Sequence, residues 1–339
     1  MWRRRAGRCN GPVCTGADHV ILVAPDSFKG TYTAAQVAAY IATGIRSVGG
    51  TAHEMPVADG GEGTFDVIFQ GLQAQPLTVS TVGPWGDETK AVIGLNQNGT
   101  AIVELASASG LNMPTEQTRD PLAATTYGTG VLIAEAVRQG ARQILVAAGG
   151  SATTDGGSGA ITAIEEAGGL HGAQLVVLSD VTTRFSDAAR VFGPQKGADP
   201  ATVQLLTQRL QRLAETLKRD PRNIDRGGAA GGFAGGMWAQ YDASLVSGAD
   251  YILDLLEADA LIAASEAVIV GEGRLDSQTG QGKIISGILA RSGRIPVYAV
   301  VGSVDENLGS YANNFADVMT AGDGPAMTAA GAHVAAQKR

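Results

Sequence analysis

The sequence predicts an α/β fold in which a parallel sheet is interrupted by an inserted segment with antiparallel strands. Three observations indicate this class: a strand–helix–strand unit near the start, a run of short alternating strands after it, and a return of buried strands further along. The chain has 339 residues, which is long for one hydrophobic core and suits two α/β domains. We therefore expect one domain to be inserted into the other.

The strand–helix–strand unit opens the predicted fold. Residues 19–25 (HVILVAP) form a short apolar run rich in β-branched side chains, which is typical of a buried strand. Thr33 and Gln36 fit a capping box at the start of a helix, and two consecutive glycines mark its end. A second strand at about residues 52–57 would complete a βαβ unit.

The alternating segment follows at residues 76–105. Its turn signals are Trp-Gly-Asp at residues 85–87 and Asn-Gln-Asn-Gly at residues 96–99, and both are typical of hairpins. A helix at about residues 128–139 and a strand at residues 143–148 extend this segment.

Buried strands return after residue 174, and we expect them to rejoin the first sheet. Asp199 and Pro200 mark the start of a long helix among them, because Asp caps helices and Pro suits the first turn. The expected strands are residues 174–179, 267–270, 296–301 and 317–320.

Composition excludes several classes of function. The net charge of −8 argues against nucleic acid as the main partner, and no apolar run reaches the ~18 residues of a membrane span. Cys9 and Cys14 both lie near the start, and the four histidines show no ligand spacing, so we expect no disulfide framework, zinc site or histidine-based catalysis. This fits a cytoplasmic protein. Residues 1–18 are basic, lack the apolar core of a signal peptide, and are expected to be a disordered extension.

Charged residues follow the ends of the predicted parallel strands, which is where open α/β sheets bind ligands. We expect these residues to gather at one edge of one sheet. The charged residues are Asp26 and Lys29 after the first strand, with the polar Ser27 between them, Asp180 after residues 174–179, and Glu272, Arg274, Asp276 and Lys283 after residues 267–270.

Three glycine-rich loops add backbone amides to these charges. Residues 58–64 (ADGGEGT) and 149–157 (GGSATTDGG) precede helices, where amides bind anions. Residues 271–287 (GEGRLDSQTGQGKIISG) lack the Walker A spacing. Carboxylates, cations and amides together are the components of phosphoryl transfer. A dinucleotide-dependent dehydrogenase is the main alternative, but no Gly-x-Gly-x-x-Gly occurs in these loops.

Seven motifs, in this order, resemble the bacterial glycerate kinases of the two-domain type. The resemblance covers about residues 19–330, and the order of seven motifs is far more specific than any one of them. The motifs are PDSFKG at 25–30, ADGGEGT at 58–64, TYGTG at 126–130, GGSAT at 149–153, FGPQKG at 192–197, GAAGG at 228–232 and GEGRLD at 271–276.

The resemblance implies a flavodoxin-like parallel-sheet domain with a second, mixed-sheet α/β domain inserted into it. We expect the flavodoxin-like domain at residues 19–60 and 160–339 and the inserted domain at residues 61–159. The implied reaction is transfer of the γ-phosphoryl group of ATP to D-glycerate, with Mg²⁺, to give 2-phosphoglycerate or 3-phosphoglycerate. The site would lie in the cleft between the domains, and a homodimer is left open.

The resemblance also implies roles for individual residues. Asp180 would be the general base or would organise the metal, with Lys29 and Asp26 as further catalytic residues. Glu272 and Asp276 would hold Mg²⁺ or its waters. The substrate would be bound by Ser27, Arg274, Asp59, Glu62 and Ser151, and the phosphates of ATP by Lys196, Lys283, Gly271, Gly273, Gly149 and Gly150.

The sequence departs from the family pattern after Asp180. Thr182-Thr183-Arg184 stands where the family has a variable residue followed by Asn-Pro. The stretch between residues 157 and 175 is also shorter than in the family. Two alternatives therefore stay open: a kinase of this fold for another small hydroxy acid, or a catalytically weak nucleotide-binding regulator.

Overall fold

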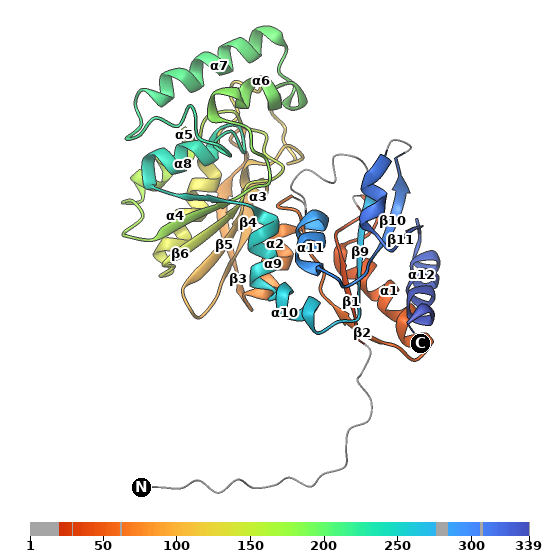
Figure 1. Ribbon diagram of the computed structural model, residues 1–339. Coiled ribbons are helices and arrows are strands. Elements are labelled where there is room, and N and C mark those ends of the chain that lie inside the picture. The colour runs from red at the N-terminus through yellow and green to blue at the C-terminus, as the bar shows by residue number, and fades with distance from the viewer. Residues whose placement is uncertain (1–19, 29, 62, 276–283, 306–307, 339) are drawn as a thin grey trace, which may run out of the picture.

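The computed structural model describes residues 20–28, 30–61, 63–275, 284–305 and 308–338. Figure 1 shows two lobes, each built around one β-sheet. The first sheet is parallel throughout and has the order β11-β10-β9-β1-β2. Numbered along this sheet alone, the order is 2-1-3-4-5, which is the flavodoxin-like order. Its strands are β1 (Val20–Pro25), β2 (Thr51–Glu54), β9 (Ala267–Leu275), β10 (Val297–Val304) and β11 (Asp317–Thr320).

The second sheet is mixed and has the order β3-β4-β5-β6-β7-β8. The first three strands are antiparallel, as the two hairpin signals predicted, and β5 to β8 are parallel. The sheet lies between β2 and β9 in the sequence, so the predicted fold class is confirmed. Its strands are β3 (Gln75–Val82), β4 (Glu88–Leu95), β5 (Thr100–Glu104), β6 (Gln143–Ala147), β7 (Gln174–Leu178) and β8 (Ser244–Val246).

The strand β7 belongs to the mixed sheet, and the prediction that it rejoins the first sheet was wrong. It pairs with β6, with Gln143 opposite Gln174, and with β8 on its other side. A buried apolar run has the same pattern in either parallel sheet, so its sequence does not reveal its partner. We therefore propose that the inserted part runs to about residue 247.

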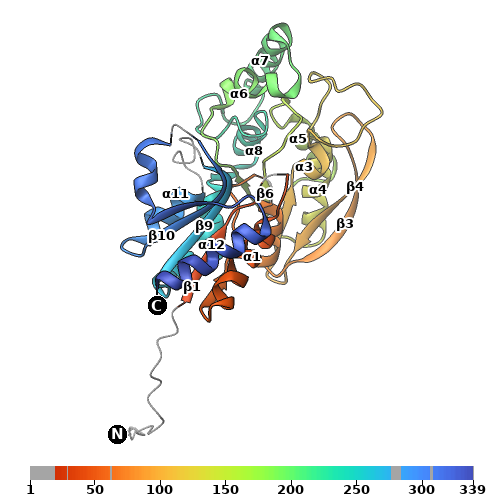
Figure 2. The same cartoon turned by 90° about the vertical axis from the view of Figure 1, so that its right-hand side faces the viewer.

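The helices α1 and α12 lie side by side on one face of the parallel sheet, as Figures 1 and 2 both show. Glycine permits this close packing: a Cβ on Gly44 would lie 1.9 Å from the carbonyl oxygen of Thr328. The predicted capping box begins α1, since the amide of Gln36 donates to Thr33 Oγ1 at 3.2 Å. The helices are α1 (Ala34–Ser47) and α12 (Gly324–Gln337).

Helices between the two sheets join the lobes into one hydrophobic core. The core includes Leu22 and Val270 from the parallel sheet, Ile102 and Leu145 from the mixed sheet, and Ile252 from α9. In Figure 1, α2 and α9 lie between the sheets. The helices of this layer are α2 (Thr64–Gly71), α9 (Gly248–Leu255), α10 (Ala258–Ala263) and α11 (Ile284–Ser292).

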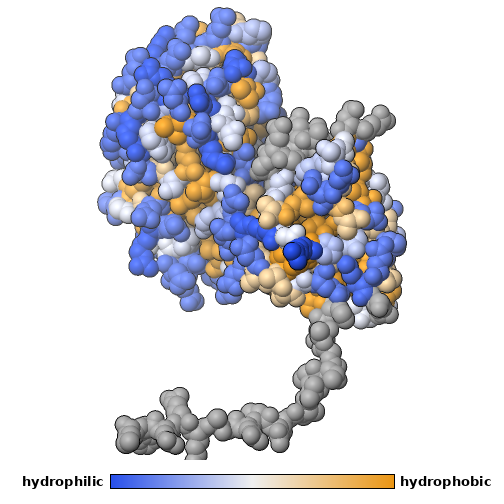
Figure 3. Space-filling view, viewed as in Figure 1, coloured by the Kyte–Doolittle hydropathy of each residue, from blue (hydrophilic) through white to orange (hydrophobic). Residues whose placement is uncertain are grey.

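The remaining α-helices belong to the lobe of the mixed sheet. Asp199 caps α7, because the amide of Thr202 donates to Asp199 Oδ1 at 2.7 Å. Hydrophilic side chains dominate the α6–α7 end of this lobe in Figure 3. The helices are α3 (Ala106–Ser109), α4 (Tyr127–Arg138), α5 (Ser158–Glu166), α6 (Ala188–Phe192), α7 (Pro200–Ala214) and α8 (Phe233–Tyr241), with short 3₁₀ helices at Phe185–Asp187 and Pro194–Lys196. A third 3₁₀ helix, Gly309–Asn314, lies between β10 and β11 of the parallel sheet. Within the described ranges, every helix is too short or too polar to span a bilayer.

Candidate active site

The two chain segments that connect the sheets meet at the carboxylate of Asp180, which follows β7. A Cβ on Gly60, in the outgoing segment after β2, would lie 2.6 Å from Asp180 Oδ2. A Cβ on Gly248, in the returning segment after β8, would lie 2.7 Å from Gly60 Cα and 3.3 Å from Asp180 Oδ2. Only glycine fits such contacts, so both connections approach this carboxylate as closely as backbone can.

Asp180 is held by the first turn of α9. The hydroxyl of Ser247 donates to Asp180 Oδ1 at 2.7 Å, and the amide of Ala249 donates to Oδ2 at 3.2 Å. Burial raises the pKa of Asp180 to about 6, and the charge of Asp59 adds to this, while the two hydrogen bonds and Arg226 act in the opposite direction. A carboxyl group with this pKa can take up a proton near neutral pH.

Lys196 presents a buried ammonium group to the same region. The residue is only 7% exposed, and Nζ donates to Ser151 Oγ at 2.8 Å and to the carbonyl oxygen of Thr153 at 2.6 Å. Burial lowers the pKa of Lys196 to about 8, against the opposing charge of Asp155. An ammonium group has three N–H donors, so these two bonds leave one donor for an anion.

A cavity of about 460 Å³ brings these groups together. Six of the residues predicted for the site line it: Asp59, Gly149, Gly150, Ser151, Asp180 and Lys196. No role was predicted for the other lining residues, which are Gly60, Gly61, Leu111, Ala148, Ser179, Val181, Phe192, Gln195 and Ala230. The cavity combines a carboxylate, a cation and glycine-rich backbone, and these are groups that phosphoryl transfer can use.

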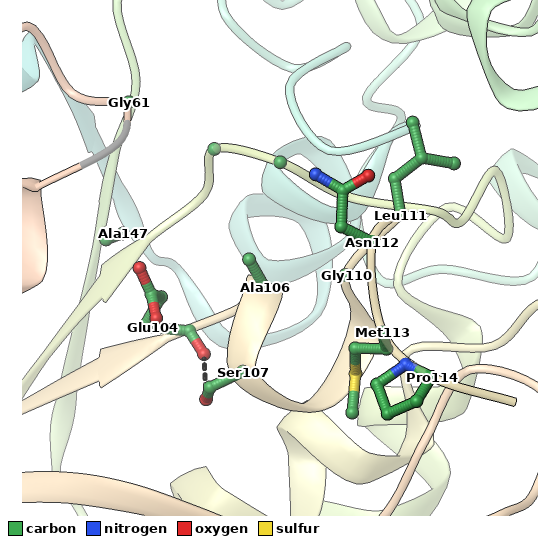
Figure 4. A pocket seen from close by; sticks show the side chains of 12 residues that line it. Gly61, Glu104, Ala106, Ser107, Gly110, Leu111, Asn112, Met113, Pro114 and Ala147 are labelled. Atoms are coloured by element: carbon green, nitrogen blue, oxygen red, sulfur yellow. Dashed lines mark hydrogen bonds between the residues drawn. The ribbon is translucent and has the colours of Figure 1, made fainter. Parts of the chain in front are cut away.

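A second cavity, of about 530 Å³, adjoins the first and shares four lining residues with it. Figure 4 shows Glu104 at the end of β5 and Asn112 on the following loop, both at this cavity. The hydroxyl of Ser107 donates to the carbonyl oxygen of Glu104 at 2.7 Å. No charge pattern or glycine cluster marks this loop, so it could not be predicted as part of the site. The shared residues are Gly61, Leu111, Gly149 and Gly150.

Asp26 and Ser27 line a third cavity, of about 380 Å³. Pro56, Val57 and Gly63 also line it, whereas residues 59–61 line the cavity around Asp180, so the connecting segment contributes to both. The amide of Ser27 donates to Asp26 Oδ1 at 2.6 Å, and Ser27 Oγ is buried with no hydrogen-bond partner among the residues that the structure describes. The predicted single edge of charges was wrong, because Asp26 and Asp180 follow strands of different sheets.

The end of β9 carries the next group of predicted residues. The carbonyl oxygen of Gly271 accepts a hydrogen bond from the amide of Asp26 at 2.8 Å. The carbonyl oxygen of Gly273 faces Gly302, where an added Cβ would lie 2.6 Å from it. Arg274 is 65% exposed and pairs with Asp305 at 2.5 Å. Glu272 is not among the described residues that line the cavity of Asp180.

Four predicted site residues lie outside the described part of the chain: Lys29, Glu62, Asp276 and Lys283. Within the described part, no three side chains of His, Cys, Asp or Glu are grouped so as to hold a metal ion by themselves. The predicted pair of Mg²⁺ ligands, Glu272 and Asp276, therefore stays a prediction.

Arg226 holds the loop around Asp180 through two hydrogen bonds to its backbone. Its Nη1 donates to the carbonyl oxygen of Ser179 at 2.6 Å, and its amide donates to that of Thr182 at 3.3 Å. The amide of Gly228 donates to the carbonyl oxygen of Thr183 at 2.9 Å. Neither Arg226 nor Ser247 was predicted; for Ser247 the helix-capping pattern Ser-Gly-Ala-Asp was an available signal.

Comparison with known proteins relates the whole described fold to one family. The profile of the glycerate kinase family matches residues 21–167 and 165–338. A glycerate kinase from Halalkalibacterium halodurans is 37% identical over 328 residues, which cover 85% of this chain and 86% of that protein. A glycerate 2-kinase from Escherichia coli is 35% identical over 329 residues, with 85% and 86% covered. A solved structure described as glycerate kinase 2 from Salmonella typhimurium gives a TM-score of 0.81 at 31% identity, covering 94% of this chain and 98% of that one.

Proposed function

Because the chain belongs to the glycerate kinase family, we propose that it transfers the γ-phosphoryl group of ATP to D-glycerate. The single observation that carries this proposal is that Asp180 and Lys196 line the same cavity. In this reaction a carboxylate can accept the proton of the attacking hydroxyl group. An ammonium group can stabilise the negative charge on the transferred phosphoryl group.

Asp180 would take the proton of the attacking hydroxyl group. Its pKa of about 6 leaves the carboxyl group mostly ionised at neutral pH, yet basic enough to accept a proton as the phosphorus–oxygen bond forms. The third N–H of Lys196 and the glycine backbone at residues 149–150 would receive the phosphoryl oxygens. These assignments support transfer within the cavity of about 460 Å³.

Kinases of this kind use Mg²⁺, which neutralises charge on the phosphate oxygens when it is bound. Mg²⁺ usually keeps several waters and takes only one or two protein carboxylates together with phosphate. The absence of a three-ligand group among the described residues is compatible with such a site. Glu272, in the second half of β9, would supply one carboxylate.

We also propose that the product is 2-phosphoglycerate, because the relative from Escherichia coli carries the name glycerate 2-kinase. The alternative acceptor, another small hydroxy acid, is favoured by one observation. The loop after Asp180 has Thr182-Thr183-Arg184 where the resemblance leads us to expect a variable residue followed by Asn-Pro, and this loop borders the proposed base.

A coupled assay of ADP release tests the reaction. The purified protein is supplied with ATP, Mg²⁺ and D-glycerate, or with lactate, tartronate or glycolate in its place, and ³¹P spectra identify the product. We expect turnover with D-glycerate and a phosphate on the C2 oxygen. Turnover only with another hydroxy acid would reject D-glycerate as the substrate, and ATP binding without any turnover would favour the regulator.

A further inference from the structure

Ser247 touches the proposed base without lining the cavity that holds it. The hydroxyl of Ser247 donates to Asp180 Oδ1 at 2.7 Å and accepts from the amide of Asp250 at 3.2 Å. Ser247 is not among the described residues that line the cavity of Asp180. The Ser247 side chain therefore contacts the Asp180 carboxylate without being one of the described residues that line the cavity. It also caps α9.

The carboxylate of Asp180 has little freedom to turn away from this partner. Its Oδ2 accepts from the amide of Ala249 at 3.2 Å, so both oxygens are bound to the first turn of α9. Oδ2 also occupies the space beside Gly60, where a Cβ would lie 2.6 Å from it. The two hydrogen-bond donors of α9 and the backbone of Gly60 together favour one orientation of the Asp180 carboxylate.

The support for this orientation comes from the layer of helices that joins the two sheets. Asp180 follows a strand of the mixed sheet, but α9 packs against α2, α10 and α11 in the layer that joins the sheets. Arg291 on α11 pairs with Asp254 of α9 at 2.8 Å. The base and the helix that holds it are thus supplied by two parts of the fold, and Ser247 is their hydrogen-bonded junction.

We infer that Ser247 is a positioning residue, which holds the Asp180 carboxylate in the orientation that receives the proton of the acceptor hydroxyl. The inference rests on the proposed kinase function. Proton transfer requires the base within hydrogen-bond reach and correctly aligned, so an orienting partner acts on turnover and not on substrate binding.

Loss of the Ser247 hydroxyl group should change the pH dependence of kcat, because it changes the pKa of Asp180. The hydrogen bond favours the ionised carboxylate, so its removal raises the pKa of Asp180 further. Asp59, which acts in the same direction as burial, and Arg226, which opposes it, stay in place, as does Lys196 across the cavity. The acidic limb of the kcat profile therefore moves to higher pH.

The test compares Ser247→Ala and Ser247→Thr with the wild type in D-glycerate turnover. We expect Ser247→Ala to lower kcat about tenfold, the size typical of a hydrogen bond to a charged group, with both KM values changed less than about twofold. The acidic limb of its kcat–pH profile should move to higher pH. Ser247→Thr keeps the hydroxyl group, so its kcat and the position of its acidic limb should match those of the wild type.

Asp323→Ala is the matched control, because Asp323 caps α12 through the amide of Ala326 at 2.8 Å, away from Asp180. It should lose stability as a capping mutant does and keep the wild-type kcat and pH profile. If the wild type is active and Ser247→Ala has the same kcat and the same acidic limb, the positioning role of Ser247 is overturned. The proposed kinase function would be unaffected by that result.

A second measurement does not depend on turnover. The pKa of Asp180 is read from ¹³C-carboxyl NMR shifts, assigned by comparison with Asp180→Asn, in the wild type and in Ser247→Ala. We expect a higher pKa in Ser247→Ala, even if the wild type proves inactive toward D-glycerate. An equal pKa in the two proteins would overturn the positioning role, whereas an inactive wild type alone would count against the kinase proposal.

Discussion

Lys196 Nζ and Ser151 Oγ lie 2.8 Å apart, so a buried ammonium group is tied to the glycine-rich loop that follows β6. Charged side chains are rarely buried unless they are paired or bind a ligand. Here the hydrogen-bond partners are a hydroxyl and a carbonyl group, which leave the positive charge of Lys196 available to the cavity. This arrangement leads to the first prediction.

Replacement of Lys196 by Met should remove the ammonium group that is proposed to donate a hydrogen bond to phosphate. It puts an apolar side chain of similar length in its place. We expect kcat/KM for ATP to fall about 10²-fold or more, as when one donor to transition-state charge is removed. The melting temperature should not fall greatly, because a buried charge is removed. Lys218→Met, at an exposed lysine, is the control and should match the wild type. Wild-type kcat/KM in Lys196→Met would contradict the role.

The pH dependence of kcat should be bell-shaped. Asp180, with a pKa of about 6, must be ionised to act as a base, so activity should fall below about pH 6. Lys196, with a pKa of about 8, must be protonated to hold phosphate, so activity should fall above about pH 8. The measurement is kcat from pH 5 to pH 9.5 at saturating substrates. A flat profile across this range would show that neither group titrates in the rate-determining state.

Gly248→Ala should damage the site by moving backbone. The new Cβ would lie 2.7 Å from Gly60 Cα, so one of the two connecting segments must shift beside Asp180. We expect kcat to fall at least about tenfold, since small displacements of reacting groups are costly. Gly322→Ala is the control, because nothing lies within 4 Å of its Cβ position. Equal activity of the two variants would count against the close approach at Asp180.

Asp180→Asn should be more stable than the wild type at pH 8. Burial raises the folded-state pKa of Asp180 from its ordinary value of 3.8 to about 6, so the folded state disfavours the ionised form. The stabilising effect of a protonated Asp180 is fully present below pH 3.8 and is lost as the pH rises through 6. We expect a melting temperature about 2 °C or more above the wild type at pH 8, and no such gain at pH 4. Differential scanning calorimetry at both pH values decides this, and a less stable variant at pH 8 would refute it.

Local patterns made much of the fold predictable. The Thr33–Gln36 capping box, the Asp199 cap and both hairpin turns are confirmed because each depends on neighbouring residues. The family resemblance drawn from seven motifs is confirmed as well. The partner of β7 could not be predicted, because strand pairing depends on distant segments and a buried strand looks alike in both sheets.

The candidate site was predictable where motifs carry their own chemistry. Asp59, Asp180 and Lys196 were singled out from glycine-rich or strand-end motifs and do share a cavity. Ser247 was missed because its contact with Asp180 joins residues 67 positions apart, which no local spacing reveals. Arg274 was predicted to bind the substrate carboxylate, and its pairing with Asp305 could not be foreseen from the motif.

The most direct test of the central claim is kcat of Asp180→Asn with ATP, Mg²⁺ and D-glycerate, with the Kd of each substrate measured in parallel. Asn keeps the shape of the side chain and an oxygen that can accept from Ser247, but it cannot take a proton. We expect kcat to fall about 10³-fold with both Kd values nearly unchanged. A kcat within about tenfold of the wild type, with both substrates still bound, would contradict Asp180 as the base.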